Sequence, residues 1–192
     1  CFIGNKHDPY SDIGIVSAQG GKITNLTNSG YTSGSPAWTM DGNAILFTSE
    51  RYGMRNHASW GSMEDVFLCF VNQDAYDKYR LSKEDYELLK EVEKEQEKLK
   101  KDAKKADDKK DEKKDNAKDI VIEFDGIQDR IVRLTPNSSS LGSAIIDKKG
   151  ENLYYTASFE KGMDLWKLDL RKKDVKLANK GVGYASFEMS KD

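Results

Sequence analysis

The chain has 192 residues and nearly balanced charge, with 31 lysines and arginines against 33 aspartates and glutamates. Its formal net charge of −2 gives no general attraction to nucleic acids or membrane surfaces, so we expect neither as a partner. Only Cys1 and Cys69 are present, which excludes a disulfide framework. The sequence contains no apolar run of 18 residues, which excludes a membrane-spanning helix.

Residues 1–31 contain three short segments with the composition of β-strands. They read CFIGN at the N-terminus, DIGIVSA from Asp12 and KITNLT from Lys22. Aliphatic residues bounded by Asp, Pro, Gly and Asn are typical of strands separated by turns. We interpret this part as the second, third and fourth strands of a four-stranded unit.

Residues 32–136 repeat the same order of segments and add one strand in front. The segment SPAWTMDGNAILFT, from Ser35, combines a short apolar strand, a charged turn ending in a glycine and a second apolar strand. DVFLCFV from Asp65 and RIVRLT from Arg130 follow as the third and fourth strands. We interpret this part as one complete four-stranded unit.

Two insertions, at about residues 54–63 and 74–126, make this unit longer than the others. The longer insertion predicts a helix from Ser82, because Ser82 and Asp85 form a capping box. A thin heptad seam follows along this helix at Leu89, Val92, Leu99, Ala103 and Ala106. The seam fits either a partner-binding coiled coil or a solvated helix that frays into a charged tail. Its small apolar area favours the solvated helix.

Residues 137–180 form a third unit. SAIIDKKGENLYYT, from Ser143, matches the segment from Ser35 at an offset of 108 residues without a gap. DLWKLDL from Asp164 and DVKLAN complete the unit. YASFEMSKD, from Tyr184, matches the start of each unit, so residues 181–192 predict the first strand of a further one.

The unit length without insertions is about 43 to 44 residues, with four short strands in each unit. This spacing is typical of β-propeller blades. The sequence therefore predicts an all-β fold: a partial β-propeller of four-stranded antiparallel blades with a charged helical insertion in one blade. A closed propeller has about 4–8 blades, so we expect the chain to be a piece of a larger one. The alternative is a small antiparallel-sheet protein whose hairpins are alike by chance.

The sequence contains no arrangement of residues that is typical of a catalytic site. Neither His7 nor His57 accompanies a nucleophile motif, and there is no Gly-x-Ser-x-Gly elbow or phosphate-binding loop. Asp12, Asp65 and Asp164 stand singly near strand starts, where a carboxylate accepts hydrogen bonds from a turn rather than binding calcium. We therefore expect no catalytic, cofactor-binding or metal-binding residue, and no enzyme activity of the chain by itself.

The short insertion is the candidate binding site. It contains His57 and Trp60 in a Gly-, Ser- and Met-rich loop, and propellers place binding residues on such loops. We expect these two residues to contact a peptide or a partner protein. Packing of Trp60 against a neighbouring blade is an equal alternative, and a catalytic role of His57 is a disfavoured one.

Several segments resemble known propeller families. SPAWTMDGNAILFTSERYG, residues 35–53, resembles the blade signature of TolB- and tricorn-type propellers. Residues 51–81, the charged insertion and the return FDGIQDRIVRLT resemble more closely the bacterial tricorn-like serine peptidases, which carry a propeller ahead of the catalytic part. In that family the catalytic residues lie outside the propellers, beyond a PDZ module, and none of those motifs is matched here.

The resemblance implies a non-catalytic propeller segment that contributes to peptide substrate access and to assembly of a serine peptidase. The alternative is a protein-binding propeller module of a TolB-like envelope protein without peptidase activity. The implied partners are peptides or unfolded polypeptide, the remainder of the same polypeptide, and further copies in a homo-oligomer. The implied location is the periplasm, with the cytoplasm as the alternative.

Overall fold

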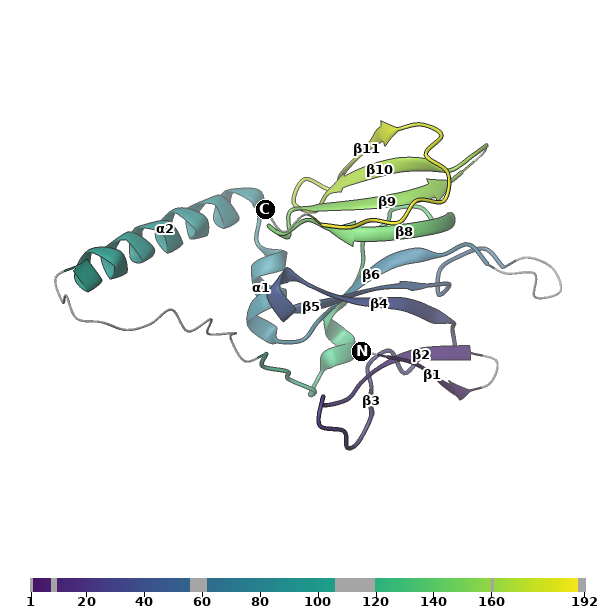
Figure 1. The fold of residues 1–192 in the computed structure, drawn as a ribbon, viewed down its shortest axis with the longest axis horizontal. Helices are drawn as coiled ribbons and strands as arrows, with labels where there is room; N and C mark the ends of the chain where they lie inside the picture. Colours follow the sequence, from purple (N-terminus) through teal and green to yellow (C-terminus); the bar gives the residue numbers. More distant parts are fainter. Residues whose placement is uncertain (1, 8–9, 56–61, 106–119, 160, 190–192) are drawn as a thin grey trace.

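The computed structural model describes residues 2–7, 10–55, 62–105, 120–159 and 161–189. Its strands form three antiparallel sheets that follow one another in chain order from the bottom to the top of Figure 1. The first sheet contains β1 (Phe2–His7), β2 (Tyr10–Ile15) and β3 (Thr24–Asn25), in that order. This arrangement is a partial β-propeller, as the repeat predicts.

The second and third sheets have four strands each, with every strand beside its neighbour in sequence. The second sheet contains β4 (Ser33–Thr39), β5 (Ala44–Ser49), β6 (Asp65–Phe70) and β7 (Ile131–Arg133). The third contains β8 (Ser140–Ile146), β9 (Asn152–Ser158), β10 (Asp164–Asp169) and β11 (Asp174–Asn179). Short 3-10 turns, η1 (Met40–Gly42) and η3 (Ile127–Arg130), lie between strands.

Two hydrophobic clusters hold the sheets face to face. Successive side chains of a strand point to opposite faces, so Ile45 and Leu46 on β5 enter different clusters. On β6, Phe67 contributes to the cluster shared with the first sheet and Leu68 to the one shared with the third. All six residues of β5 and of β6 are buried, because the second sheet is covered on both faces.

Two helices join β6 to β7. Helix α1 (Gln73–Arg80) begins after Asn72, whose side chain accepts a hydrogen bond from the Ala75 amide at 2.8 Å. Helix α2 (Lys83–Lys105) begins as predicted, since the Ser82 hydroxyl accepts from the Asp85 amide at 3.1 Å. The sequence analysis did not separate α1 from the helix that follows it.

Helix α2 extends away from the sheets (Figure 1). Its apolar side chains Leu88, Val92 and Leu99 are exposed. This exposure is compatible with both the solvated helix and the partner-binding coiled coil. The expected charged tail, beyond residue 105, lies outside the described residues.

Residues 181–189 form no strand, contrary to the expectation for residues 181–192. A strand needs a hydrogen-bonded neighbour, and none of the described strands pairs with this segment. An apolar pattern alone therefore does not produce a strand at this place.

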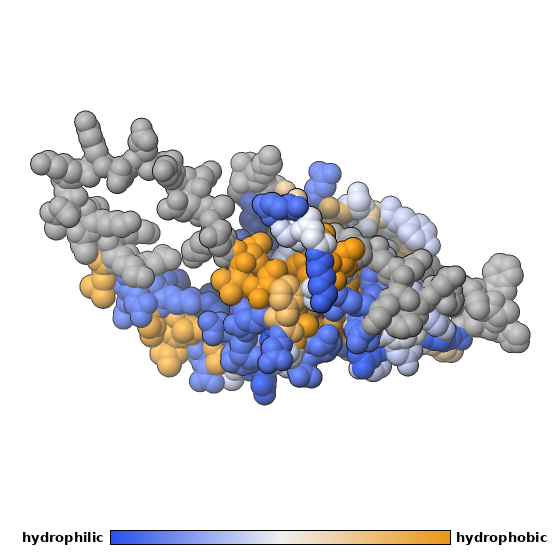
Figure 2. Space-filling model, turned by 90° about the horizontal axis from the view of Figure 1, so that it is seen from below, coloured by the Kyte–Doolittle hydropathy of each residue, from blue (hydrophilic) through white to orange (hydrophobic). Residues whose placement is uncertain are grey.

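The face of the molecule seen from below carries hydrophobic surface at its middle (Figure 2). Exposed hydrophobic side chains in the loop between β2 and β3 and in the segment before η3 include Ile23 and Phe124. Gathered apolar surface is typical of a place where further protein packs. No helix within the described ranges is long and apolar enough to cross a membrane.

Candidate functional site

The aspartates near strand starts have a structural role, as predicted. The Asp12 carboxylate accepts hydrogen bonds from the Thr27 hydroxyl at 2.8 Å and from the Ser29 amide at 3.0 Å. Asp65, which is fully buried, accepts from the Thr135 hydroxyl and from Arg133 Nη2. These carboxylates tie the next-to-last strand of a sheet to the turn after its last strand.

His57 and Trp60, the predicted contact residues, lie outside the described residues, but the base of their loop is described. Arg55 and Ser62 form an isolated antiparallel bridge there. The Arg55 guanidinium lies 5.1 Å from the ring centre of Tyr31 and 5.7 Å from that of Tyr10. The short insertion therefore begins against the first sheet.

Two glutamates at this base have opposite pKa shifts. Burial raises the pKa of Glu64, and the negative charge of Glu50 raises it further. Burial would also raise the pKa of Glu50, but hydrogen bonds from Thr32 and Ser62 and the charge of Arg55 outweigh it and lower that pKa. The surroundings of Glu50 therefore favour its ionised form, whereas the surroundings of Glu64 disfavour its ionised form.

A large hollow lies at the other end of the sheets, beside the helices. We call it the insertion groove, and its volume is about 860 Å³. Two tight turns form one wall, around Gly42 and Gly150. Helix α1, the start of α2 and the segment from Ile120 to Glu123 form the remaining walls.

Position 42 requires glycine for two reasons, its backbone conformation and the lack of room for a side chain. Gly42 has φ of +82°, and a Cβ there would lie 2.7 Å from Ile120 Cδ1. The return segment therefore packs directly on the β4–β5 turn. This close approach brings Ile120 and Val121 into the groove wall.

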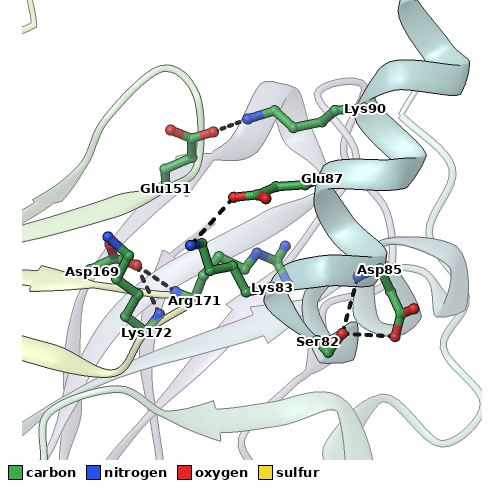
Figure 3. Close-up of polar contacts among 9 residues, drawn as sticks. All are labelled: Ser82, Lys83, Asp85, Glu87, Lys90, Glu151, Asp169, Arg171 and Lys172. Carbon is green, nitrogen blue, oxygen red and sulfur yellow. Dashed lines mark hydrogen bonds and ion pairs between the residues drawn. The ribbon is translucent and has the colours of Figure 1, made fainter.

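Arg171, just after β10, fixes the helices against the third sheet. Its Nη1 donates to the Tyr79 carbonyl at 2.6 Å, and its guanidinium lies 3.8 Å from the ring centre of Tyr86. Lys90 on α2 donates to Glu151, an ion pair seen in Figure 3. Cations near the last carbonyls of α1 also match the negative end of its dipole.

The insertion groove has a mixed lining. It contains the aromatic rings of Tyr79 and Tyr86, the aliphatic Val121, and both acidic and basic side chains. Burial raises the pKa of Tyr79 despite the nearby charge of Arg171, so its hydroxyl stays protonated near neutral pH. Within the described part of the chain, no group of three or more His, Cys, Asp or Glu residues is placed to hold a metal.

Sequence reasoning missed this groove. Tyr79 and Arg171 are 92 positions apart, so no local pattern announces their contact. The only available signals were the N-terminal cap at Asn72 and the excess of tyrosine in the segment that follows.

These twisted antiparallel sheets, stacked face to face, define a protein of the β-propeller class. No family model matches the chain, and no curated protein matches it. Among solved structures, the chain is similar to the tricorn protease, with a TM-score of 0.52 and 10% sequence identity. That match covers 91% of this chain and 16% of the other.

A second similar structure is TolB from Acinetobacter baumannii, with a TM-score of 0.45 and 13% identity. It covers 88% of this chain and 27% of the other. The chain thus spans between about a sixth and about a quarter of these two proteins. At such identities the likeness concerns the propeller fold alone.

Proposed function

We propose that this chain is a non-catalytic β-propeller segment of a tricorn-like serine peptidase, where it contributes to peptide substrate access and to assembly. The observation that carries the proposal is the insertion groove, an 860 Å³ hollow walled by the very insertion on which the family resemblance rests. The catalytic residues of the parent enzyme then lie outside this chain.

The lining of the insertion groove suits a polypeptide. Tyr79, Tyr86 and Val121 offer apolar and aromatic surface, which binds side chains with little sequence preference. Acidic and basic groups in the same groove, such as Asp74 and Lys149, can meet either charge.

The hydrophobic surface of Figure 2 supports the assembly part of the proposal. We assign it to contacts with the remainder of the same polypeptide or with further copies in a homo-oligomer. We propose the periplasm as the location, on the family resemblance.

Filling the groove tests the access role. Val121 is 63% exposed and borders the groove, so Val121→Trp fills space without disturbing the core. Val16→Trp, at a half-exposed position that does not border the groove, is the matched control. In the full-length parent, we expect Val121→Trp to slow cleavage of long polypeptides more than cleavage of short peptides.

Equal rates for the parent and the Val121→Trp variant on both substrates would remove the access role. A parent that contains the propeller but cleaves no peptide would instead favour the alternative, a protein-binding module of a TolB-like envelope protein.

A further inference from the structure

A second hollow of about 500 Å³ lies between α1, β7 and the turn joining β10 to β11. We call it the basic groove. Four cationic side chains border it, Arg80, Arg133, Arg171 and Lys173, together with two tyrosines and aliphatic residues. Among the described residues that line it, none is acidic. Neighbouring like charges without acidic partners raise the local positive potential.

Arg133 also borders this hollow, but its charge is used elsewhere. Its Nη2 donates to the Asp65 carboxylate at 2.9 Å, and its guanidinium lies 5.3 Å from the ring centre of Tyr52. We therefore do not include Arg133 among the groups that would hold a ligand.

The three remaining cations are held by aromatic rings. Lys173 Nζ lies 4.3 Å from the ring centre of Tyr79, and the Arg80 guanidinium lies 5.5 Å from that of Tyr76. Arg171 Nε is buried and has no hydrogen-bond partner among the described residues. These contacts fix the positions of the cations but leave hydrogen-bond donors for a further group.

Lys173 has an unfavourable backbone conformation. Its φ of +56° lies in the left-handed region, which residues other than glycine seldom adopt. Burial and the positive charge of Arg171 lower the pKa of its ammonium, and Asp169 only partly offsets them. The Asp169 carboxylate accepts from the Arg171 and Lys172 amides, each at 2.9 Å, and does not line the groove, although its negative charge offsets part of the positive potential.

We propose that the basic groove binds acidic side chains of a polypeptide. Guanidinium groups pair with carboxylates through well-directed hydrogen bonds, and aliphatic and aromatic walls suit the carbon atoms that carry them. Tyr79 and Arg171 border both grooves, so one polypeptide can extend from the insertion groove into the basic groove. This inference rests on the proposed function and adds a preference for Glu- and Asp-rich substrate.

Binding of short labelled peptides to the full 192-residue chain tests the inference. A Glu-rich peptide and its Gln counterpart of equal length are measured by fluorescence anisotropy, and inorganic phosphate is measured by isothermal titration calorimetry. We expect the Glu-rich peptide to bind more tightly than the Gln peptide. Lys173→Gln and Arg80→Gln should each weaken the Glu-rich peptide about threefold or more. Circular dichroism of each variant confirms its fold.

Lys172→Gln is the matched control, because Lys172 is next in sequence and does not border the groove. Weakening by Lys172→Gln equal to that by Lys173→Gln would overturn the inference, since it would indicate general charge attraction. Equal binding of the Glu-rich and Gln peptides would also overturn it, while leaving the proposed peptide access intact. Binding of phosphate without binding of the Glu-rich peptide would assign the groove to small anions instead.

Discussion

Single buried carboxylates connect strands that are far apart in the sequence. Asp65 lies 70 positions from Thr135, yet its carboxylate accepts a hydrogen bond from that hydroxyl at 2.8 Å. The Thr135 hydroxyl in turn accepts from the Val66 amide at 3.2 Å. Thr27 makes the same two contacts, with Asp12 and with the Ile13 amide. The repeat thus preserves a hydrogen-bond network as well as an apolar pattern.

Asp65→Ala should be among the most destabilising single substitutions. It leaves Arg133 Nη2 and the hydroxyls of Thr135 and Ser138 without their acceptor at a buried place. Because the Arg133 side chain is 31% exposed and can be solvated, we expect a loss of about 2–3 kcal/mol of unfolding free energy, less than for a fully buried ion pair. Urea unfolding measures it, with Asp164→Ala as the comparison, because the Asp164 carboxylate is half-buried and accepts from the Gly181 amide. Equal losses for the two variants would contradict the structural role argued for Asp65.

Glu64→Gln should stabilise the protein at neutral pH. Burial and Glu50 raise the folded-state pKa of Glu64 above its ordinary value of 4.5. The folded state therefore holds the proton of Glu64 more tightly than the unfolded state. The free energy of unfolding is highest below the unfolded-state pKa and falls as pH rises through the folded-state pKa. The neutral amide avoids that loss, so we expect a gain of up to about 1 kcal/mol at pH 7.

The Glu64→Gln gain should disappear below about pH 4, where Glu64 is protonated in both states. Thermal unfolding at several pH values measures the difference from the parent. Glu188→Gln, an exposed position, is the control and should show no such pH-dependent gain. A gain for Glu64→Gln that persists unchanged in acid would contradict the electrostatic cause.

At the scale of elements, the helical insertion is attached to two sheets. It belongs in sequence to the second sheet, between β6 and β7, and Arg171 and Glu151 bind it to the third. The start of α2 is held in this way, whereas its distal part projects from the sheets (Figure 1). The insertion therefore closes the end of the second and third sheets and creates both grooves.

Arg171→Met should loosen this attachment without unfolding the sheets. The methionine keeps some apolar contact with Tyr86 but loses the donor to the Tyr79 carbonyl. We expect amide hydrogen exchange in α1 and in the first turns of α2 to become about tenfold faster, which corresponds to about 1.4 kcal/mol of local opening.

Arg51→Met is the control for the attachment of the helices. Arg51 also lies over a tyrosine ring, at 5.5 Å from that of Tyr52, but it does not contact the helices. Unchanged exchange in α1 of the Arg171→Met variant would show that other contacts hold the insertion.

The sequence predicts those elements whose stabilising contacts join residues close together in the chain. The start of α2 was predictable because Ser82 and Asp85 are three positions apart. Strand order was predictable because strands of one unit pair with their sequence neighbours. The contact of Arg171 with Tyr86 was not, since it joins an insertion to a turn of the next unit and has no counterpart in the repeat.

At the scale of the whole molecule, the three sheets follow one another so that only the second sheet is packed against another sheet on both faces. The second sheet shares one cluster with the first sheet and the other cluster with the third. The outer strand β11 of the third sheet is largely exposed. Repeat structures in which each unit contacts only its neighbours lose structure first at the ends of the stack.

Hydrogen exchange should therefore follow position in the stack. We expect the amides of β5 and β6 to exchange most slowly, through global unfolding, because both strands are central in a sheet buried on both faces. The amides of β11 should exchange through local opening at least about tenfold faster. Mass spectrometry of the labelled protein after digestion measures both regions in one experiment.

Phe47→Ala extends the exchange experiment, because Phe47 packs only in the cluster between the first and second sheets. It should accelerate exchange in β2 and β5 while leaving β11 unchanged, since β11 already opens without the rest of the stack. A cavity of this kind costs about 3–5 kcal/mol. Protection of β11 as strong as that of β6, lost together with it in the Phe47→Ala variant, would mean that the sheets unfold as one cooperative unit.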